Sequence, residues 1–160
     1  MRTRIVALLI VFVLIAGAAV APGSTSAAKD APGCEGLAVY RAAIFAAGHD
    51  LNAKLVAQGI PPIRDRATYS SSDWTSYAQD AGDYQTALKT IAPPAFAAAW
   101  HQAKIEHTGL LQQISLTVAK SNVLAISAFA KSLTDNAAKT DAAVVSGAKT
   151  CADFTQFTID

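Results

Sequence analysis

Three histidines and two cysteines are the first candidates for metal or acid–base chemistry in this 160-residue chain. A chelating pair on a helix needs a spacing of three or four residues, because only then do both side chains share a face. His101 and His107 are six residues apart, which turns them about 120° away from each other on a helix. No Glu-x-x-His pair, phosphate-binding loop or catalytic triad can be specified, so we expect no enzymatic activity, no metal and no bound cofactor.

One metal-binding alternative stays open, a metal- or haem-binding bundle that uses His107 together with His49 or His101. The chain has no Cys-x-x-Cys-His sequence for covalent attachment of haem. Its single methionine is Met1, so no other methionine is present to serve as an axial ligand.

His107 falls on the apolar stripe of its predicted helix, at a level where the facing residues are small. In one interpretation the imidazole fills the core and bonds to Tyr77, Tyr84, Asp50 or Asp135. In the other, a small mid-bundle pocket with a polar handle binds a small apolar ligand, as bundle cores often do. The candidate pocket residues are His107, Gly48, Ala81, Ala137, Tyr77 and Tyr84.

Apolar residues at spacings of three and four predict four helices and no strand. Helix ends are indicated by Gly59, Pro61-Pro62 and Pro93-Pro94, which interrupt these apolar stripes. The serines at 70–72 are candidate helix caps. The weakest turn is Ser121-Asn122, where one long helix could continue. The fold class we predict is all-α, an up-down-up-down four-helix bundle, with one domain over 28–160 and helices over 34–58, 72–91, 94–120 and 122–152.

Cys34 and Cys151 test this topology, because the start of the first helix and the end of the fourth lie at the same pole of such a bundle. We therefore predict a disulfide between them, as expected for two cysteines in a secreted chain. A lipid-modified Cys34 is the rival, but Ala31-Pro32-Gly33 does not abut the apolar leader as a lipidation site should. Phe154 and Phe157, which follow Cys151, are predicted to pack back on the bundle end.

The first residues have the order of a secretory signal peptide: basic Arg2 and Arg4, an apolar run over 5–21, then small residues. We predict a leader over 1–27; an uncleaved anchor is the alternative, since the run nearly reaches the length of a membrane span. Loss of the two arginines changes the net charge from +1 to −1. The predicted product is a near-neutral secreted or periplasmic monomer without a stable membrane anchor and without affinity for nucleic acid.

The sequence is 52% hydrophobic, and 35 of its residues are alanine. With Ile91-Ala92-Pro93-Pro94, then Phe96, Trp100-His101 and terminal cysteines, it resembles a group of secreted bacterial alanine-rich four-helix-bundle proteins with a Pro-Pro helix start and no assigned activity. That resemblance implies a fold and a compartment, and it makes His101 the recurrent histidine. The function we expect is a non-enzymatic module that binds an unknown protein partner or a small apolar ligand.

Overall fold

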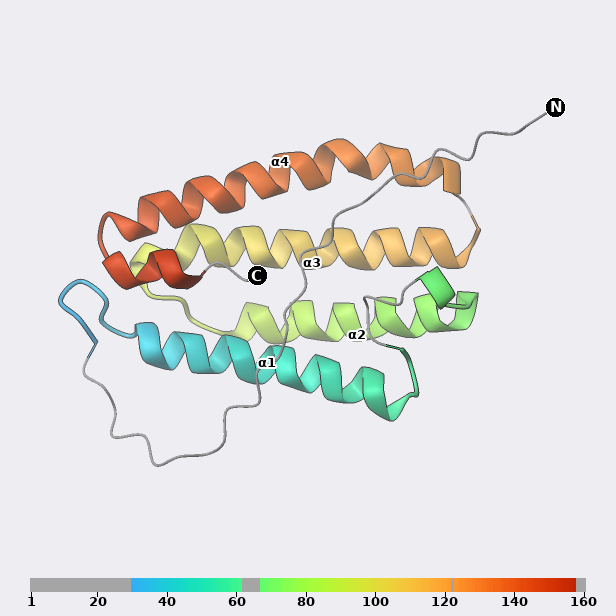
Figure 1. The fold of residues 1–160 in the computed structure, drawn as a ribbon, viewed down its shortest axis with the longest axis horizontal. Coiled ribbons are helices and arrows are strands. Elements are labelled where there is room, and N and C mark those ends of the chain that lie inside the picture. The colour runs from blue at the N-terminus through green and yellow to red at the C-terminus, as the bar shows by residue number, and fades with distance from the viewer. Residues whose placement is uncertain (1–29, 62–66, 122, 158–160) are drawn as a thin grey trace.

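The computed structural model describes residues 30–61, 67–121 and 123–157, and all regular structure in these ranges is helical. Consecutive long helices run in opposite directions (Figure 1), so the fold is an all-α, up-down-up-down four-helix bundle. The signal peptide predicted over 1–27 lies outside the described residues. The elements are α1 (Leu37–Ala57), α2 (Ser71–Thr90), η2 (Ala95–Ala97), α3 (Ala98–Ala119), α4 (Val123–Ala148) and η3 (Ala152–Phe157).

Local sequence explains where these helices begin and end. Ser70 and Asp73 form a capping box: the Ser70 hydroxyl accepts from the Asp73 N–H at 3.2 Å, and the Asp73 carboxylate accepts from the Ser70 N–H at 2.8 Å. Gly59, at φ +69°, ends α1 in a Schellman motif, in which Ile60 N–H donates to the Leu55 carbonyl. Ser121, at φ 56°, turns the chain between α3 and α4, so the predicted weak turn is a real break.

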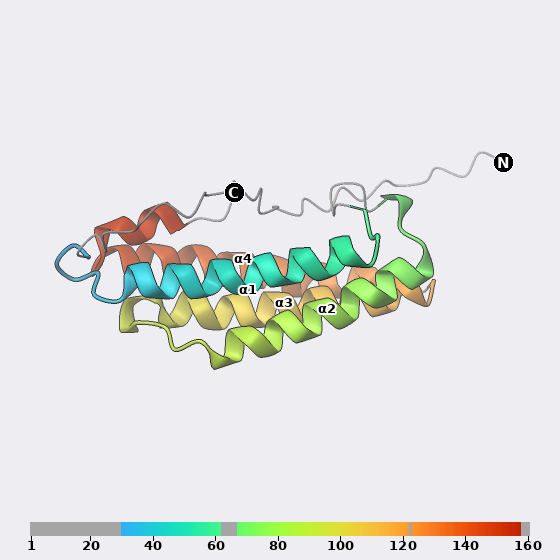
Figure 2. The same ribbon diagram turned by 90° about the horizontal axis from the view of Figure 1, so that it is seen from below.

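The helices pack in chain order, with α1 on α2, α2 on α3, and α3 on α4. Figure 1 shows α1 and α4 at the two outer edges of this arrangement, and Figure 2 shows the same bundle from the α1 side. The short η3 folds back on α4 at the pole where α1 begins. None of the helices within the described ranges is long and apolar enough to cross a bilayer.

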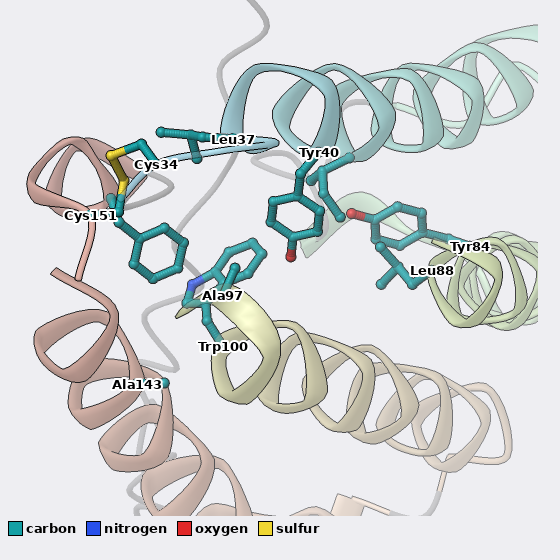
Figure 3. Close-up of a cluster of buried hydrophobic side chains, with 11 residues drawn as sticks. Cys34, Leu37, Tyr40, Tyr84, Leu88, Ala97, Trp100, Ala143 and Cys151 are labelled. Atoms are coloured by element: carbon teal, nitrogen blue, oxygen red, sulfur yellow. A yellow bond between two sulfur atoms is a disulfide. The ribbon is translucent and has the colours of Figure 1, made fainter. Parts of the chain in front are cut away.

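A disulfide between Cys34 and Cys151 closes this pole, with an S–S distance of 2.06 Å, which confirms the predicted bond. Both cysteines are almost fully buried, and Phe154 packs edge-on against Trp100, as predicted for this part of the tail. The Phe157 side chain lies outside the described residues. Figure 3 shows the core around the bond, which gathers side chains from all four long helices and the tail: Leu37, Tyr40, Ile44, Tyr84, Leu88, Ala97, Trp100, Ala143 and Phe154.

Candidate functional site

His101 is the deeply buried histidine of the bundle, at 5% exposure. Its Nε2 lies 3.0 Å from the Leu88 carbonyl oxygen, and its Nδ1 lies 3.0 Å from the Tyr40 hydroxyl. A carbonyl only accepts, so Nε2 carries the proton and Nδ1 accepts from the Tyr40 O–H. Burial lowers the pKa of His101 and raises that of Tyr40, which keeps both groups neutral. With both ring nitrogens engaged, His101 links α1, α2 and α3 and has no nitrogen left for a metal.

His107 lies half-buried nearly two turns further along α3 and bonds to Asn136, which was not among its predicted partners. Its Nδ1 donates to the Asn136 Oδ1 at 3.2 Å, and the Asn136 Nδ2 donates to the Ala103 carbonyl at 2.9 Å. Asn136 is 3% exposed, so this pair joins α3 to α4 inside the bundle. Burial is the main cause that lowers the pKa of His107, and the charge of Lys104 adds to it.

The prediction of Tyr77, Tyr84, Asp50 or Asp135 as the partner of the His107 Nδ1 was therefore wrong. The error follows from the helical phase of α4. The predicted stripe followed apolar residues and placed Ala137 inward, but Ala137 is exposed. Asn136 takes the inward position instead because its amide is satisfied by the two α3 partners across the helix interface.

The remaining candidate pocket residues are dispersed. Ala81 and Tyr84 are buried in α2, whereas Tyr77 is half-buried and packs against Tyr69 and Trp74. Gly48 is half-buried in α1, where an added Cβ would have no described atom within 4 Å. None of the six predicted residues lines either of the two hollows described below.

Two polar groups inside the bundle, the Tyr84 hydroxyl and the Lys104 ammonium, are largely shielded from water. The Tyr84 hydroxyl is fully buried and has no hydrogen-bond partner among the described residues, and burial raises its pKa to about 12. Burial also lowers the pKa of the Lys104 ammonium to about 8, because a charged amine is poorly solvated there. Between about pH 8 and pH 12 the Tyr84 hydroxyl and the Lys104 amine are therefore both mainly uncharged.

Two hollows lie mainly between α3 and α4, one of them also bordered by Gln85 of α2, and we call them together the α3–α4 groove. One half is polar, has a volume of about 430 Å³, and is lined by Gln85, Glu106, Gly109, Leu110, Gln113, Ser132, Asp135, Asn136 and Lys139. The other half is mostly apolar, has the same volume of about 430 Å³, and is lined by Ala99, Gln102, Ala103, Glu106, Lys139, Ala142, Ala143 and Ser146. Both halves are open to the surface rather than enclosed.

An ion pair spans the α3–α4 groove where its halves meet. Lys139 Nζ donates to the Glu106 carboxylate at 3.0 Å, and the Gln102 amide donates to the same carboxylate at 3.2 Å. The hydrogen bond from Lys139 lowers the pKa of Glu106 below its usual range. The sequence stripes missed this groove, although Asn136, Thr140, Ala143 and Gly147 share a spacing of four, three and four that could have indicated the inward face of α4.

A metal centre finds little support in these positions. His49 is exposed on α1, whereas the His107–Asn136 pair joins α3 to α4. Both ring nitrogens of His101 are already engaged in hydrogen bonds. In the ranges that the structure covers, no group of three histidine, cysteine, aspartate or glutamate side chains is arranged to hold an ion.

Comparisons of this chain with protein-family models, with curated proteins and with solved structures give no match.

Proposed function

We propose that this protein is an extracytoplasmic, non-enzymatic binding module that docks a peptide segment of a partner protein in the α3–α4 groove. The observation that carries the proposal is the groove itself, two adjoining hollows of about 430 Å³ each on one face of the bundle. Each volume is at the lower end of the range for small-molecule pockets, about 300–1,000 Å³, and such pockets enclose most of their ligand. An open groove with two such halves suits a segment that lies along it.

The two halves offer different contacts to such a segment. Alanines on facing helices leave room for apolar side chains to approach the backbone closely. In the polar half, Gln113 and Ser132 present an exposed amide and an exposed hydroxyl that can bond to peptide groups. The ion pair of Glu106 and Lys139 provides one charge of each sign between the halves. A partner segment fits the α3–α4 groove when one end carries apolar side chains and the other end carries uncharged polar side chains. The apolar end then lies in the apolar half and the polar end in the polar half.

The compartment is proposed from two independent features. Disulfides persist in oxidising compartments, and the Cys34–Cys151 bond lies in the core of this fold. Residues 1–27 have the order of a cleavable leader. N-terminal sequencing of the exported protein should begin near Ala28, and an exported product that begins at Met1 would contradict cleavage.

A display experiment tests the groove. A random-peptide display library is selected against the natively processed protein, and the enriched peptides are then measured by calorimetry against two variants. Ala142→Trp fills the apolar half of the groove, whereas Val145→Trp changes an exposed α4 residue that lines neither half. We expect Ala142→Trp to weaken binding at least tenfold and Val145→Trp to leave it unchanged. Peptides that bind all three proteins equally, or a library that yields no binder, would contradict the proposal.

A further inference from the structure

The outer face of α1 carries apolar side chains that nothing in the bundle covers. Of the five large hydrophobic side chains that the described part of the chain exposes, three lie on this helix: Val39 at 76%, Phe45 at 58% and Val56 at 67%. Val39 and Val56 are the two ends of a line of exposed residues spaced three, four, three, four and three apart, which places them on one stripe of the helix. We call this line the α1 seam; it consists of Val39, Ala42, Ala46, His49, Ala53 and Val56.

The α1 seam faces away from the bundle and carries no acidic residue, lysine or arginine. The buried residues of α1, Leu37, Tyr40 and Ile44, lie on the opposite side of the helix. Lys54 lies on the edge next to α2, where it bonds to Asp83 at 3.2 Å. From Val39 to Val56 the seam spans 18 residues, or about 25 Å of helix at 1.5 Å per residue. It is a stripe without charged residues of its own, bordered by the exposed Asp50, and it is long enough for a second helix to pack along it.

We propose that the α1 seam is the interface of a homodimer, in which α1 of one copy packs antiparallel on α1 of a second copy about a twofold axis. The carrying observation is that the seam reads almost the same in both directions. Its spacings are palindromic, and its residues run Val, Ala, Ala, His, Ala, Val. A twofold axis between residues 47 and 48 therefore pairs Val39 with Val56 and Ala42 with Ala53 of the other copy. It places Ala46 opposite His49. An isologous interface requires this self-complementarity.

Phe45 borders the α1 seam, about 70° round the helix from its middle, so a second copy packed along the seam covers part of this exposed ring.

A second copy suits this surface better than a membrane does. Helices that lie on membrane surfaces carry many lysines and arginines beside their apolar face. The cations of α1 are Arg41 and Lys54, and Lys54 is held by Asp83 and lies 3.7 Å from Asp50. The inference goes beyond the proposed function, because the α1 seam and the α3–α4 groove are on different helices. A dimer would present two grooves and could bind a partner at two points.

The test measures mass by light scattering and sedimentation over a range of concentrations on the natively processed protein. We expect twice the monomer mass for the unchanged protein. Ala42→Glu should give a monomer, because the register sets the new carboxylates against Ala53 of the other copy and buries them without a partner. The double variant Ala42→Glu/Ala53→Lys should recover the dimer, because each carboxylate then faces an ammonium. Val145→Glu, on α4, is the control and should remain dimeric.

Cross-linking fixes the direction of the helices. Val39→Cys/Val56→Cys should form a covalent dimer under mild oxidation, whereas Val39→Cys alone should not, because the two copies of that residue lie about 25 Å apart in the antiparallel register. A covalent dimer from Val39→Cys alone would indicate parallel helices and overturn the proposal. A monomer at all concentrations, binding of the monomer to lipid vesicles, or a dimer unaffected by Ala42→Glu would overturn it as well. Circular dichroism should show that every variant remains folded, since each changed side chain is exposed.

Discussion

Two buried polar side chains, His101 and Asn136, hold helices together through hydrogen bonds to other helices. His101 bonds to the Tyr40 hydroxyl of α1 and to the Leu88 carbonyl of α2, and Asn136 bonds to two groups of α3. A buried donor or acceptor that loses its partner costs more free energy than the bond itself contributes, because the group stays desolvated. These residues therefore specify how the helices are arranged along one another.

Replacing His101 by phenylalanine should destabilise the fold. The ring volume is kept, but the hydrogen bonds to the Tyr40 hydroxyl and to the Leu88 carbonyl are lost, at about 0.5–1.5 kcal/mol each, while the Leu88 carbonyl keeps its bond from the Ile91 N–H. Urea unfolding followed by circular dichroism measures the change. Gln79→Ala, at an exposed position of α2, is the control and should change stability by less than about 0.5 kcal/mol. An equal effect of both changes would show that the buried bonds contribute nothing.

The pH dependence of stability should reflect both buried histidines. Burial lowers the folded-state pKa of His101 and His107, whereas in the unfolded chain they titrate near about 6.5. Below that pH the unfolded state takes up protons that the folded state does not. Stability should therefore change little between about pH 7 and 7.5 and fall below about 6.5, by at most about 1.4 kcal/mol per pH unit for each histidine, whereas above about pH 8 the lowered pKa of Lys104 makes it rise.

Urea unfolding from pH 7.5 to 5 checks this expectation, with His107→Gln as the comparison. That variant should show a shallower decline, because one of the two titrating groups is gone. The carboxylates whose pKa values are lowered, Asp73 and Glu106, affect stability only at more acidic pH, so they fall outside this window. A flat profile between pH 7 and 5 would contradict the prediction.

At the scale of elements, the helices were predictable from the sequence and part of the site was not. Apolar spacing, the Ser70 cap and Gly59 placed the boundaries of α1 and α2 within three residues. The phase of α4 failed because alanine is compatible with either face, so that stripe carried little information. What decides the phase is the pairing of Asn136 with His107 and Ala103, a contact between helices that spacing within one helix does not encode.

Two helical glycines should respond differently to alanine. At Gly147, a Cβ would lie 2.5 Å from a Phe154 ring carbon and 2.6 Å from the Phe96 carbonyl oxygen, and neither can move without displacing the core. At Gly82, it would meet the end of the flexible Gln112 side chain at 2.4 Å, which can turn away. We expect Gly147→Ala to lower stability by about 1–3 kcal/mol through overpacking, and Gly82→Ala to be neutral or stabilising by up to about 1 kcal/mol.

Thermal unfolding of the two variants side by side measures the difference. If Gly147→Ala unfolds at or above the temperature of Gly82→Ala, the close packing of η3 on α4 does not constrain the fold. The unfolding midpoint of the unchanged protein is the reference for both.

For the whole molecule, the disulfide closes a loop with a sequence separation of 117 residues. In the chain-entropy model, a bond that closes so long a loop restricts the unfolded state by about 5 kcal/mol. Cys34→Ala/Cys151→Ala should therefore unfold at a clearly lower temperature and urea concentration than the oxidised protein. A reducing agent should shift the unchanged protein in the same direction and leave the double variant unaffected. Equal stability of the two proteins under oxidising conditions would contradict this account.

The position of this bond also sets the order of events during synthesis. Among these 160 residues the possible partner of Cys34 is Cys151, which follows the end of α4. All four helices have therefore been synthesised before the intramolecular bond can form, and its two thiols come together when α1 and α4 reach the same pole. The disulfide then stabilises this arrangement of the two helix ends. Until it closes, Cys34 is a lone thiol exposed to every oxidant and foreign thiol that the growing chain meets.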